Sequence, residues 1–240
     1  MFSMKKVIII GASSGIGYDL AKVFSEKGYI VGIAARREPQ LIQLQKELPN
    51  KSFIKVIDVA NFEDAKTQLK SLINEMGGMD TIILNSGIGW SYPTPQQEID
   101  TIQVNVAGFV ALGNFSTEYF IQQGSGHIVG ISSIASIRGS HIATVYSASK
   151  AFISSYMEGL RIRFYKKKQP IQVTDIRPGF VATPMTEKNK GMFWVASSEK
   201  AAKQIFEAII TKKDIAYISK RWLIIAVLYK ILPDYLIKRI

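Results

Sequence analysis

The chain has 240 residues, of which 47% are hydrophobic and 20% are charged, with no cysteine and two histidines. This length fits one domain with a sizeable core better than two domains. The absence of cysteine excludes disulfides, thiolate metal sites and a cysteine nucleophile. With only His127 and His141, we expect no histidine-rich metal site, and we expect a cytoplasmic protein.

The formal net charge is +11, and the basic residues are scattered along the chain. No aromatic residues alternate with them to form a surface on which bases could stack, so we expect no nucleic-acid partner. The phosphate of a cofactor or an anionic membrane accounts for the charge instead. The apolar run at residues 7–10 is too short for a secretory signal. The run at residues 222–229 is far shorter than the ~20 residues of a membrane-spanning helix.

Short β-branched runs alternate with longer amphipathic stretches from end to end. We predict strands over residues 7–10, 30–34, 53–57, 81–84, 127–131, 172–176 and 215–218. We predict helices over residues 15–27, 40–47, 63–75, 98–122, 145–167 and 198–211. This alternation predicts a doubly wound parallel sheet (a Rossmann fold) with helices on both faces, as a single domain over residues 1–240.

Small, polar and turn-forming residues collect where the predicted strands end. In such sheets ligands bind beyond the carboxyl ends of the strands, so these segments predict one assembled site. The segments are Gly11-Ala12-Ser13-Ser14, Ala35-Arg36-Arg37, Asp58-Val59, Asn85-Ser86-Gly87, Ser132-Ser133 and Arg177-Pro178-Gly179.

A glycine-rich turn follows the first predicted strand and opens the first helix. Gly11 permits the tight turn, Gly15 lets the backbone approach a pyrophosphate, and Gly17 lets the helix pack against the sheet. The N–H groups of the turn and the positive helix end favour phosphates. A plain strand–helix turn is the alternative, but the position after an apolar first strand favours a dinucleotide. The remaining residues predicted to bind it in this turn are Ser13, Ser14 and Ile16.

The second predicted strand ends in Arg36 and Arg37, with no acidic residue before Glu38. An acidic residue at this place holds the ribose 2′-hydroxyl of NAD, whereas an arginine accommodates the 2′-phosphate of NADP. Two guanidinium groups can make charge-assisted bonds to that phosphate, so we predict NADP(H). The alternative is that both are solvated charges at a helix end.

The spacing Tyr-x3-Lys occurs twice, in Tyr18 with Lys22 and in Tyr146 with Lys150. Only the second pair has a serine, Ser133, at a strand end that faces the predicted site. A carbonyl that accepts a hydride also needs a proton, and tyrosine with a pKa near ~10 is a weak acid. An ammonium ~4 Å from the phenolate contributes roughly 4 kcal/mol at an effective dielectric of ~20. We therefore expect Lys150 to lower the pKa of Tyr146 toward neutrality.

The order of these motifs resembles the short-chain dehydrogenase/reductase family. Its members have a glycine loop with this spacing, an Asn-Ala-Gly element, a serine and Tyr-x3-Lys. Asn85-Ser86-Gly87 stands for the Asn-Ala-Gly element with Ser in place of Ala, and the resemblance covers residues 5 to about 185. It implies hydride transfer between NADP(H) and a carbonyl or alcohol, in an enzyme that often forms dimers or tetramers.

The resemblance also implies individual roles in catalysis. Ser133 holds the substrate oxygen, Tyr146 exchanges its proton, and Lys150 also holds the nicotinamide ribose. Ser132 and Ser136 compete with Ser133 for its role. Asn105 matches the asparagine that holds a water behind the lysine, although a helix-bending core amide is the alternative.

Further cofactor contacts follow from the same resemblance. Asp58 and Val59 flank the adenine, and Asn85 and Gly87 line the adenosine ribose. A turn over the nicotinamide begins at Pro178-Gly179. Val181 and Thr183 in that turn contact the carboxamide.

Two segments follow this turn, at and beyond the C-terminal end of the family motifs. Residues 184–200 form the expected substrate lid, whose Met, Phe and Trp side chains suggest an apolar substrate. Residues 220–240 are apolar and basic, and Pro233 should divide them into two short helices. This tail could lie on a membrane surface or pack against protein. Two alternatives to the enzyme stay open, a non-catalytic dinucleotide sensor and a membrane-surface module.

Overall fold

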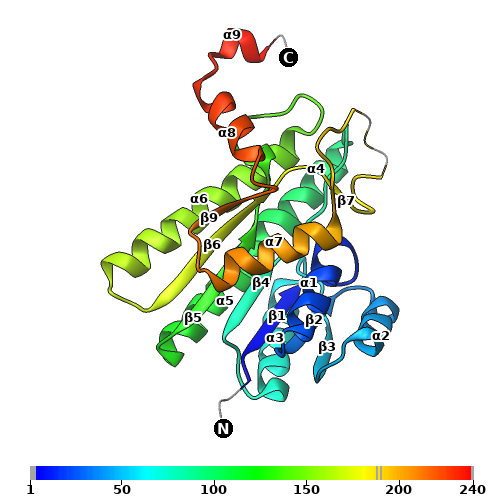
Figure 1. Cartoon of the computed structure of the whole chain (residues 1–240), viewed down its shortest axis with the longest axis vertical. Helices are drawn as coiled ribbons and strands as arrows, with labels where there is room; N and C mark the ends of the chain where they lie inside the picture. The colour runs from blue at the N-terminus through cyan, green and yellow to red at the C-terminus, as the bar shows by residue number, and fades with distance from the viewer. Residues whose placement is uncertain (1–3, 188, 190, 239–240) are drawn as a thin grey trace.

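The computed structural model describes residues 4–187, 189 and 191–238. Its core is a seven-stranded parallel sheet with the order β3-β2-β1-β4-β5-β6-β9 (Figure 1). The predicted doubly wound sheet is confirmed, and the order reverses direction between β1 and β4, where ligands bind in such folds. The strands are β1 Lys6–Ile10, β2 Ile30–Ala35, β3 Ser52–Val56, β4 Thr81–Leu84, β5 Gly126–Ile131, β6 Ile171–Pro178 and β9 Ile215–Ile218.

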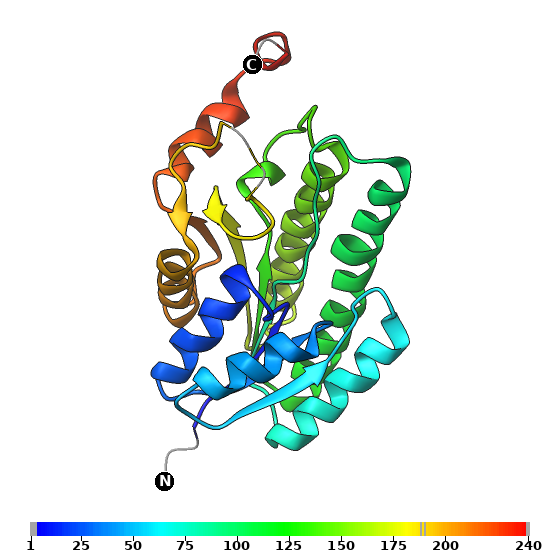
Figure 2. The same cartoon turned by 90° about the vertical axis from the view of Figure 1, so that its right-hand side faces the viewer.

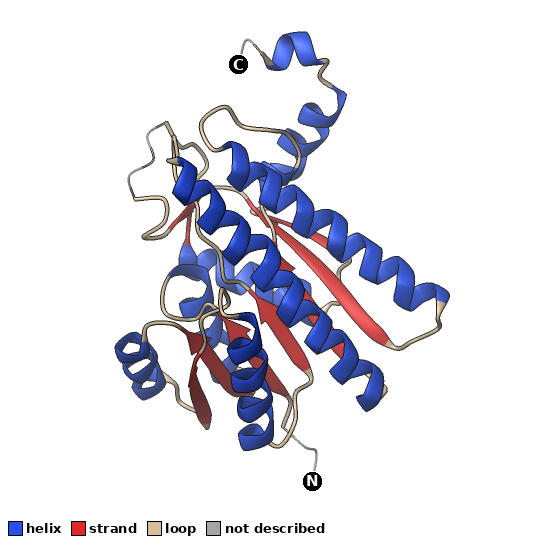
Figure 3. Cartoon of the chain, turned by 180° about the vertical axis from the view of Figure 1, so that it is seen from behind, coloured by secondary structure: helices blue, strands red, loops and turns tan. Residues whose placement is uncertain are grey.

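Helices cover both faces of the sheet (Figure 2). Alternate residues of β1 point to opposite faces, so Val7 and Ile9 enter one core while Ile8 and Ile10 enter the other. The first core is closed by α1 Gly15–Glu26, α2 Glu38–Glu47 and α7 Ser198–Ile210. The second is closed by α3 Phe62–Met76, α5 Gly108–Gln123 and α6 Thr144–Lys166, and long helices lie in front of the strands in the view of Figure 3.

The helix predicted over residues 98–122 is interrupted. It starts earlier, at α4 Pro95–Ile102, because Thr94 and Gln97 form a reciprocal capping box at its N-terminus. A π-helical segment, Gln103–Ala107, then joins α4 to α5. The prediction of one continuous helix is therefore wrong, and the π segment holds Asn105, as often happens at functional sites.

Two short strands were not expected from the sequence. β7 Val181–Ala182 pairs in parallel with β8 Ala196–Ser197, outside the main sheet. Strands of two residues are too short to show a hydrophobic period. This pairing closes the loop that follows β6.

The tail forms two helices, α8 Trp222–Ile231 and α9 Asp234–Ile237, separated by Pro233 as predicted. Both stand beyond the body of the molecule, at the end where β5 and β6 terminate (Figures 1 and 2). Residues 239–240 of the predicted tail lie outside the described residues.

His127 lies on β5 with only 8% of its surface exposed. Its Nε2 atom is 2.8 Å from the hydroxyl of Thr174, which itself donates to the Lys213 carbonyl at 2.6 Å. The hydroxyl proton is therefore used, and Nε2 carries the proton of the His127–Thr174 bond. Burial, and secondarily the charge of Lys212, lowers the pKa of His127 from 6.5 to about 4.

We expect His127 to make the fold sensitive to acid. Because its folded-state pKa is below the unfolded value, the neutral ring stabilises the fold fully above pH 6.5. This stabilisation is lost as the pH falls toward 4, by about 3 kcal/mol in the free energy of unfolding. Urea unfolding at a series of pH values should show this loss in the wild type and in the exposed-site control His141→Gln. His127→Gln, which keeps a donor for Thr174, should lack it, and an unchanged acid limb in that variant would contradict the assignment.

Candidate active site

A cleft of about 410 Å³ opens at the carboxyl ends of the strands. Its wall contains all the predicted site residues except Gly17 and Asn105, so segments far apart in the sequence form one site as expected. The predicted residues in the wall are Gly11, Ser13, Ser14, Gly15, Ile16, Arg36, Arg37, Asp58, Val59, Asn85, Gly87, Ser133, Tyr146, Lys150, Pro178, Gly179, Val181 and Thr183.

The wall also contains residues that were not predicted to bind the cofactor or to react, apart from Ser132, the competitor of Ser133, and residues 184–186 of the expected lid. They are mostly small or apolar and carry no chemical signal of their own. Thr186 is an exception, because its hydroxyl donates to the Val181 carbonyl at 2.7 Å and accepts from the Thr183 N–H at 3.1 Å. The further wall residues are Ala35, Ile57, Ser86, Ile88, Val104, Ile131, Ser132, Pro184, Met185 and Thr186.

The glycine turn is shaped by close backbone approaches. Gly11 has a φ of +90°, and a Cβ there would lie 2.7 Å from the Ser86 nitrogen. A Cβ on Gly17 would lie 2.2 Å from the Gly11 carbonyl oxygen and 2.6 Å from Nδ2 of Asn85. Gly17 therefore packs α1 against the turn from behind the cleft wall, whereas Asn85 supports the turn by donating to the Gly11 carbonyl at 2.8 Å.

The N-terminus of α1 is suited to an anion. Its N-cap, Ser14, makes no side-chain bond to the first turn, and that turn contains no acidic residue. Arg37 reaches the same end of the helix, because its guanidinium donates to Ser13 Oγ and Ser14 Oγ, each at 2.8 Å. Backbone N–H groups, the helix dipole and a guanidinium thus converge on one place, which fits the pyrophosphate of a dinucleotide.

Tyr146 and Lys150 lie one turn apart on α6, at the deep end of the cleft. Lys150 is 4% exposed, and its Nζ donates to the Ile131 carbonyl at 2.9 Å. Burial lowers the pKa of Lys150 to about 8, although the Asp175 carboxylate opposes this. The Nζ atom lies 5.7 Å from the centre of the Tyr146 ring.

The pKa direction expected for Tyr146 is wrong in this structure. Burial raises the pKa of the phenol above 10.0, with only a partial opposing effect from the Ser133 hydroxyl. The expected lowering of the Tyr146 pKa assumed that the Lys150 ammonium points at the phenolate, whereas its Nζ donates to the Ile131 carbonyl. The raised pKa keeps Tyr146 in its protonated form at neutral pH.

The structure distinguishes the three candidate serines. Ser133 lies in the cleft wall, and its Oγ accepts a bond from the Ala135 N–H at 3.1 Å. Ser132 also reaches the wall, but its hydroxyl donates to the Asp175 carboxylate and the Ile176 carbonyl. Ser136 is not among the wall residues. The Ser133 hydroxyl donates to the Pro178 carbonyl only at 3.5 Å, so of the two candidates in the wall it is the one less committed to a protein acceptor.

Asn105 is completely buried behind the cleft. Its Oδ1 accepts from the Ile88 N–H at 2.8 Å, and its Nδ2 donates to the Ile88 carbonyl and to Ser149 Oγ. A Cβ on Gly87 would lie 3.4 Å from this Oδ1 and 3.3 Å from Nζ of Lys150. Asn105 therefore holds the segment after β4 against α6, beside the lysine.

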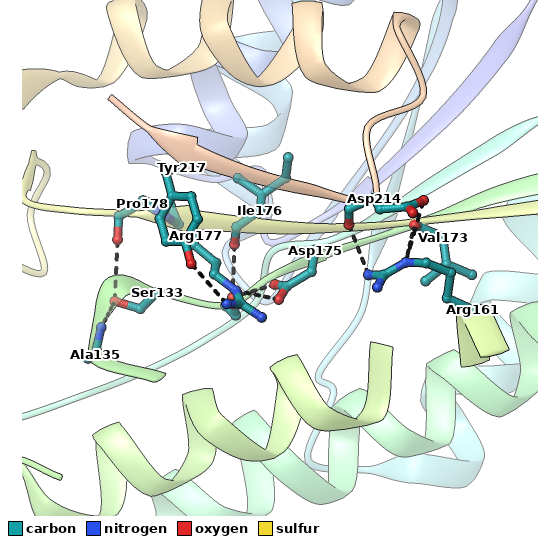
Figure 4. Close-up of polar contacts among 11 residues, drawn as sticks. Ser133, Ala135, Arg161, Val173, Asp175, Ile176, Arg177, Pro178, Asp214 and Tyr217 are labelled. Atoms are coloured by element: carbon teal, nitrogen blue, oxygen red, sulfur yellow. Dashed lines mark hydrogen bonds and ion pairs between the residues drawn. The ribbon is translucent and has the colours of Figure 1, made fainter. Parts of the chain in front are cut away.

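Asp175 and Arg177 form a buried charged pair that was not predicted (Figure 4). Asp175 is fully buried, and its carboxylate accepts from the Arg177 guanidinium at 2.7 Å and from the Ser132 hydroxyl. Arg177 also donates to the Tyr217 hydroxyl at 3.1 Å. A carboxylate between the apolar residues Val173 and Ile176 of a buried strand was the sequence signal for this cluster.

The other Tyr-x3-Lys pair, Tyr18 with Lys22, lies away from the cleft. The Tyr18 hydroxyl donates to Glu47 at 2.6 Å, and Lys22 pairs with the same carboxylate at 3.1 Å. Burial, and then Glu47, raises the pKa of Tyr18 to about 12. This pair joins α1 to α2, as expected for a surface tyrosine and lysine.

The segment predicted as a lid has three parts. Pro184, Met185 and Thr186 contribute to the cleft wall. Phe193 and Trp194 pack against Trp222 of α8, with ring centres 5.0 and 5.8 Å away. Residues 196–200 belong to β8 and the start of α7. Residues 188 and 190 lie outside the described residues.

Comparisons with known proteins identify the family of the chain. A family model described as short chain dehydrogenase matches residues 5–192. The chain is 31% identical over 215 residues to an uncharacterized oxidoreductase of Mycobacterium tuberculosis, covering 85% of this chain and 84% of that protein. It is 34% identical over 194 residues to an uncharacterized oxidoreductase of Myxococcus xanthus, covering 78% and 76%.

Solved structures show the same fold. A short-chain dehydrogenase/reductase from Burkholderia phymatum, in complex with NAD, superposes with a TM-score of 0.86 at 19% identity and covers 95% of this chain and 93% of that chain. A 3-ketoacyl-(acyl-carrier-protein) reductase from Brucella melitensis, complexed with NADH, gives 0.80 at 20% identity, covering 89% and 96%. With the family model and the ordered motifs, these findings show that the chain belongs to the short-chain dehydrogenase/reductase family of oxidoreductases.

Proposed function

We propose that the protein transfers a hydride between NADP(H) and an apolar carbonyl or alcohol substrate. The observation that carries this proposal is the convergence of Ser133, Tyr146 and Lys150 in the cleft that also contains the glycine turn and the arginines after β2. The two solved structures compared above hold NAD or NADH, so the choice of NADP(H) depends on this chain's own arginines.

The residues of the cleft divide the binding of a dinucleotide among them. The N–H groups at the start of α1 hold the pyrophosphate, and Arg36 and Arg37 hold the 2′-phosphate. Lys150 holds the nicotinamide ribose. Asp58 and Val59 contact the adenine, and Asn85 and Gly87 line the adenosine ribose. Val181 and Thr183 contact the carboxamide, and Pro178 and Gly179 form the turn over the nicotinamide.

When bound, NADPH supplies the hydride for carbonyl reduction. The Ser133 hydroxyl holds the substrate oxygen, and protonated Tyr146 donates its proton to that oxygen as the alcohol forms. Oxidation of an alcohol needs the opposite transfer, from the substrate hydroxyl to the phenolate. Met185 in the cleft wall supports an apolar substrate.

The test of the cofactor needs no substrate. We expect NADPH to bind much more tightly than NADH in a fluorescence titration of the nicotinamide. Arg36→Ala should weaken NADPH binding by about 10–100-fold and leave NADH binding unchanged, because it removes a charge-assisted contact to the 2′-phosphate. Arg37→Ala should weaken both cofactors, because Ser13 and Ser14 lose their donor.

Arg163→Ala is the matched control, since it removes an exposed positive charge from α6, away from the cleft. It should leave both affinities unchanged. Equal affinities of the wild type for the two cofactors would contradict the NADP(H) proposal. Assembly into dimers or tetramers and location in the cytoplasm stay predictions.

A further inference from the structure

The helix α8 presents an apolar surface that no described part of the chain covers. Its large side chains on this side are 43–72% exposed, although all five are aliphatic. At about 100° per residue they form a continuous arc of about 140° around the helix. This apolar tail surface consists of Leu223, Ile224, Val227, Leu228 and Ile231.

The opposite side of α8 is fixed to the catalytic body. Trp222 is 2% exposed. It lies so close to the turn that begins at Pro178-Gly179 that a Cβ on Gly179 would be 2.0 Å from its ring. At the other end, the Arg138 guanidinium donates to the Tyr229 and Leu232 carbonyls, each at 2.7 Å. The helix is therefore held against the protein by its other side, and the five exposed aliphatic side chains point away from the core.

The charge around this surface is basic. Lys220, Arg221, Lys230 and Lys238 are all exposed on or beside α8 and α9. The one acidic residue of this stretch, Asp234, is paired with Arg138 at 3.2 Å. A second copy of the chain would bring the same four cations face to face, which disfavours a symmetric pairing. An anionic surface is complementary to them.

We propose that α8 and α9 dock the protein on an anionic lipid surface. Among the described residues, no helix combines the length and apolar character needed to cross a bilayer. Docking in the headgroup layer fits α8 instead, because the arc enters the acyl boundary while the lysines meet the lipid phosphates. Tyr235, which is 64% exposed on α9, has the amphipathic ring that favours this layer.

The surface continues toward the cleft. Phe193, Trp194 and Val195 are 38–46% exposed beside α8, and Arg221 lies over the Trp194 ring at 5.1 Å. Met185, from the cleft wall, is 46% exposed. A docked molecule would hold this side of the cleft near the lipid, where apolar carbonyl compounds dissolve. That last step rests on the proposed function, whereas the docking does not.

Sedimentation of the full chain with lipid vesicles tests the docking without cofactor or substrate. We expect binding to vesicles of phosphatidylcholine mixed with phosphatidylglycerol, much weaker binding to phosphatidylcholine alone, and weakening by salt. The double variant Ile224→Asp/Val227→Asp should lose at least tenfold in partitioning. Lys230→Glu/Lys238→Glu should also lose at least tenfold, because each lysine contributes about fivefold near an anionic surface.

Ile162→Asp is the control for the apolar variants, since Ile162 is 50% exposed on α6. It should bind vesicles like the wild type, and far-UV circular dichroism should show that every variant remains folded. No sedimentation with anionic vesicles would overturn the proposal. So would binding that survives Ile224→Asp/Val227→Asp, or a concentration-dependent dimer that this variant abolishes, since the surface would then be an interface between copies.

Discussion

Tyr146→Phe should lower the turnover of carbonyl reduction by about 10²–10⁴-fold, the range of general acid catalysis, and leave NADPH binding unchanged. The substitution removes one hydroxyl from a half-buried ring and keeps its packing. The phenol is the cleft's proton donor in the proposed reaction, and its raised pKa keeps it protonated at neutral pH. Initial rates with the apolar ketone or aldehyde that the wild type reduces fastest would measure the loss.

The chain supplies a matched control in Tyr18→Phe, which alters the other Tyr-x3-Lys pair. Tyr18 bonds Glu47 outside the cleft, so its loss should leave turnover within about twofold of the wild type. Retention of full turnover by Tyr146→Phe would contradict the assigned role. A wild type that binds NADPH and reduces none of a broad set of carbonyl compounds would favour the non-catalytic sensor.

The sequence was most informative about the site at the carboxyl ends of the predicted strands, where the candidate functional residues lie. Parallel strands bring their carboxyl ends to one edge, so locating the strands was sufficient to bring Gly11, Arg36, Ser133 and Gly179 together. It was least informative where tertiary contacts decide. The π segment at Asn105 and the pairing of β7 with β8 have no local pattern that marks them.

Two further features depended on where side chains point, which the spacing of residues along the chain does not determine. The distance between Tyr146 and Lys150 along α6 predicted proximity, but not that the ammonium bonds the Ile131 carbonyl. The pKa direction of Tyr146 was therefore wrong. Likewise, the composition of the apolar tail did not show which of its sides packs against the protein, whereas the burial of Trp222 and the exposure of Ile224 do.

Asp175→Asn should lower the free energy of unfolding by about 3–5 kcal/mol, because it leaves the buried Arg177 guanidinium without its counter-charge. The Asp175 carboxylate also accepts from Ser132, beside the candidate catalytic serine (Figure 4). Urea unfolding at neutral pH would measure the loss. The control Asp214→Asn breaks an ion pair with Arg161 on the same side of the sheet, but Asp214 is 65% exposed. That variant should lose at most about 1 kcal/mol.

Asp175→Asn should also change the pH dependence of turnover. Burial lowers the pKa of Lys150 to about 8, and the Asp175 charge opposes that lowering, so removing the charge should bring the pKa below 8. If the Lys150 ammonium holds the cofactor, activity lost above about pH 8 in the wild type will be lost at lower pH in the variant. Asp214→Asn should keep the wild-type profile. An unchanged alkaline limb in Asp175→Asn would show that Asp175 affects the stability of the fold but not the pKa of Lys150.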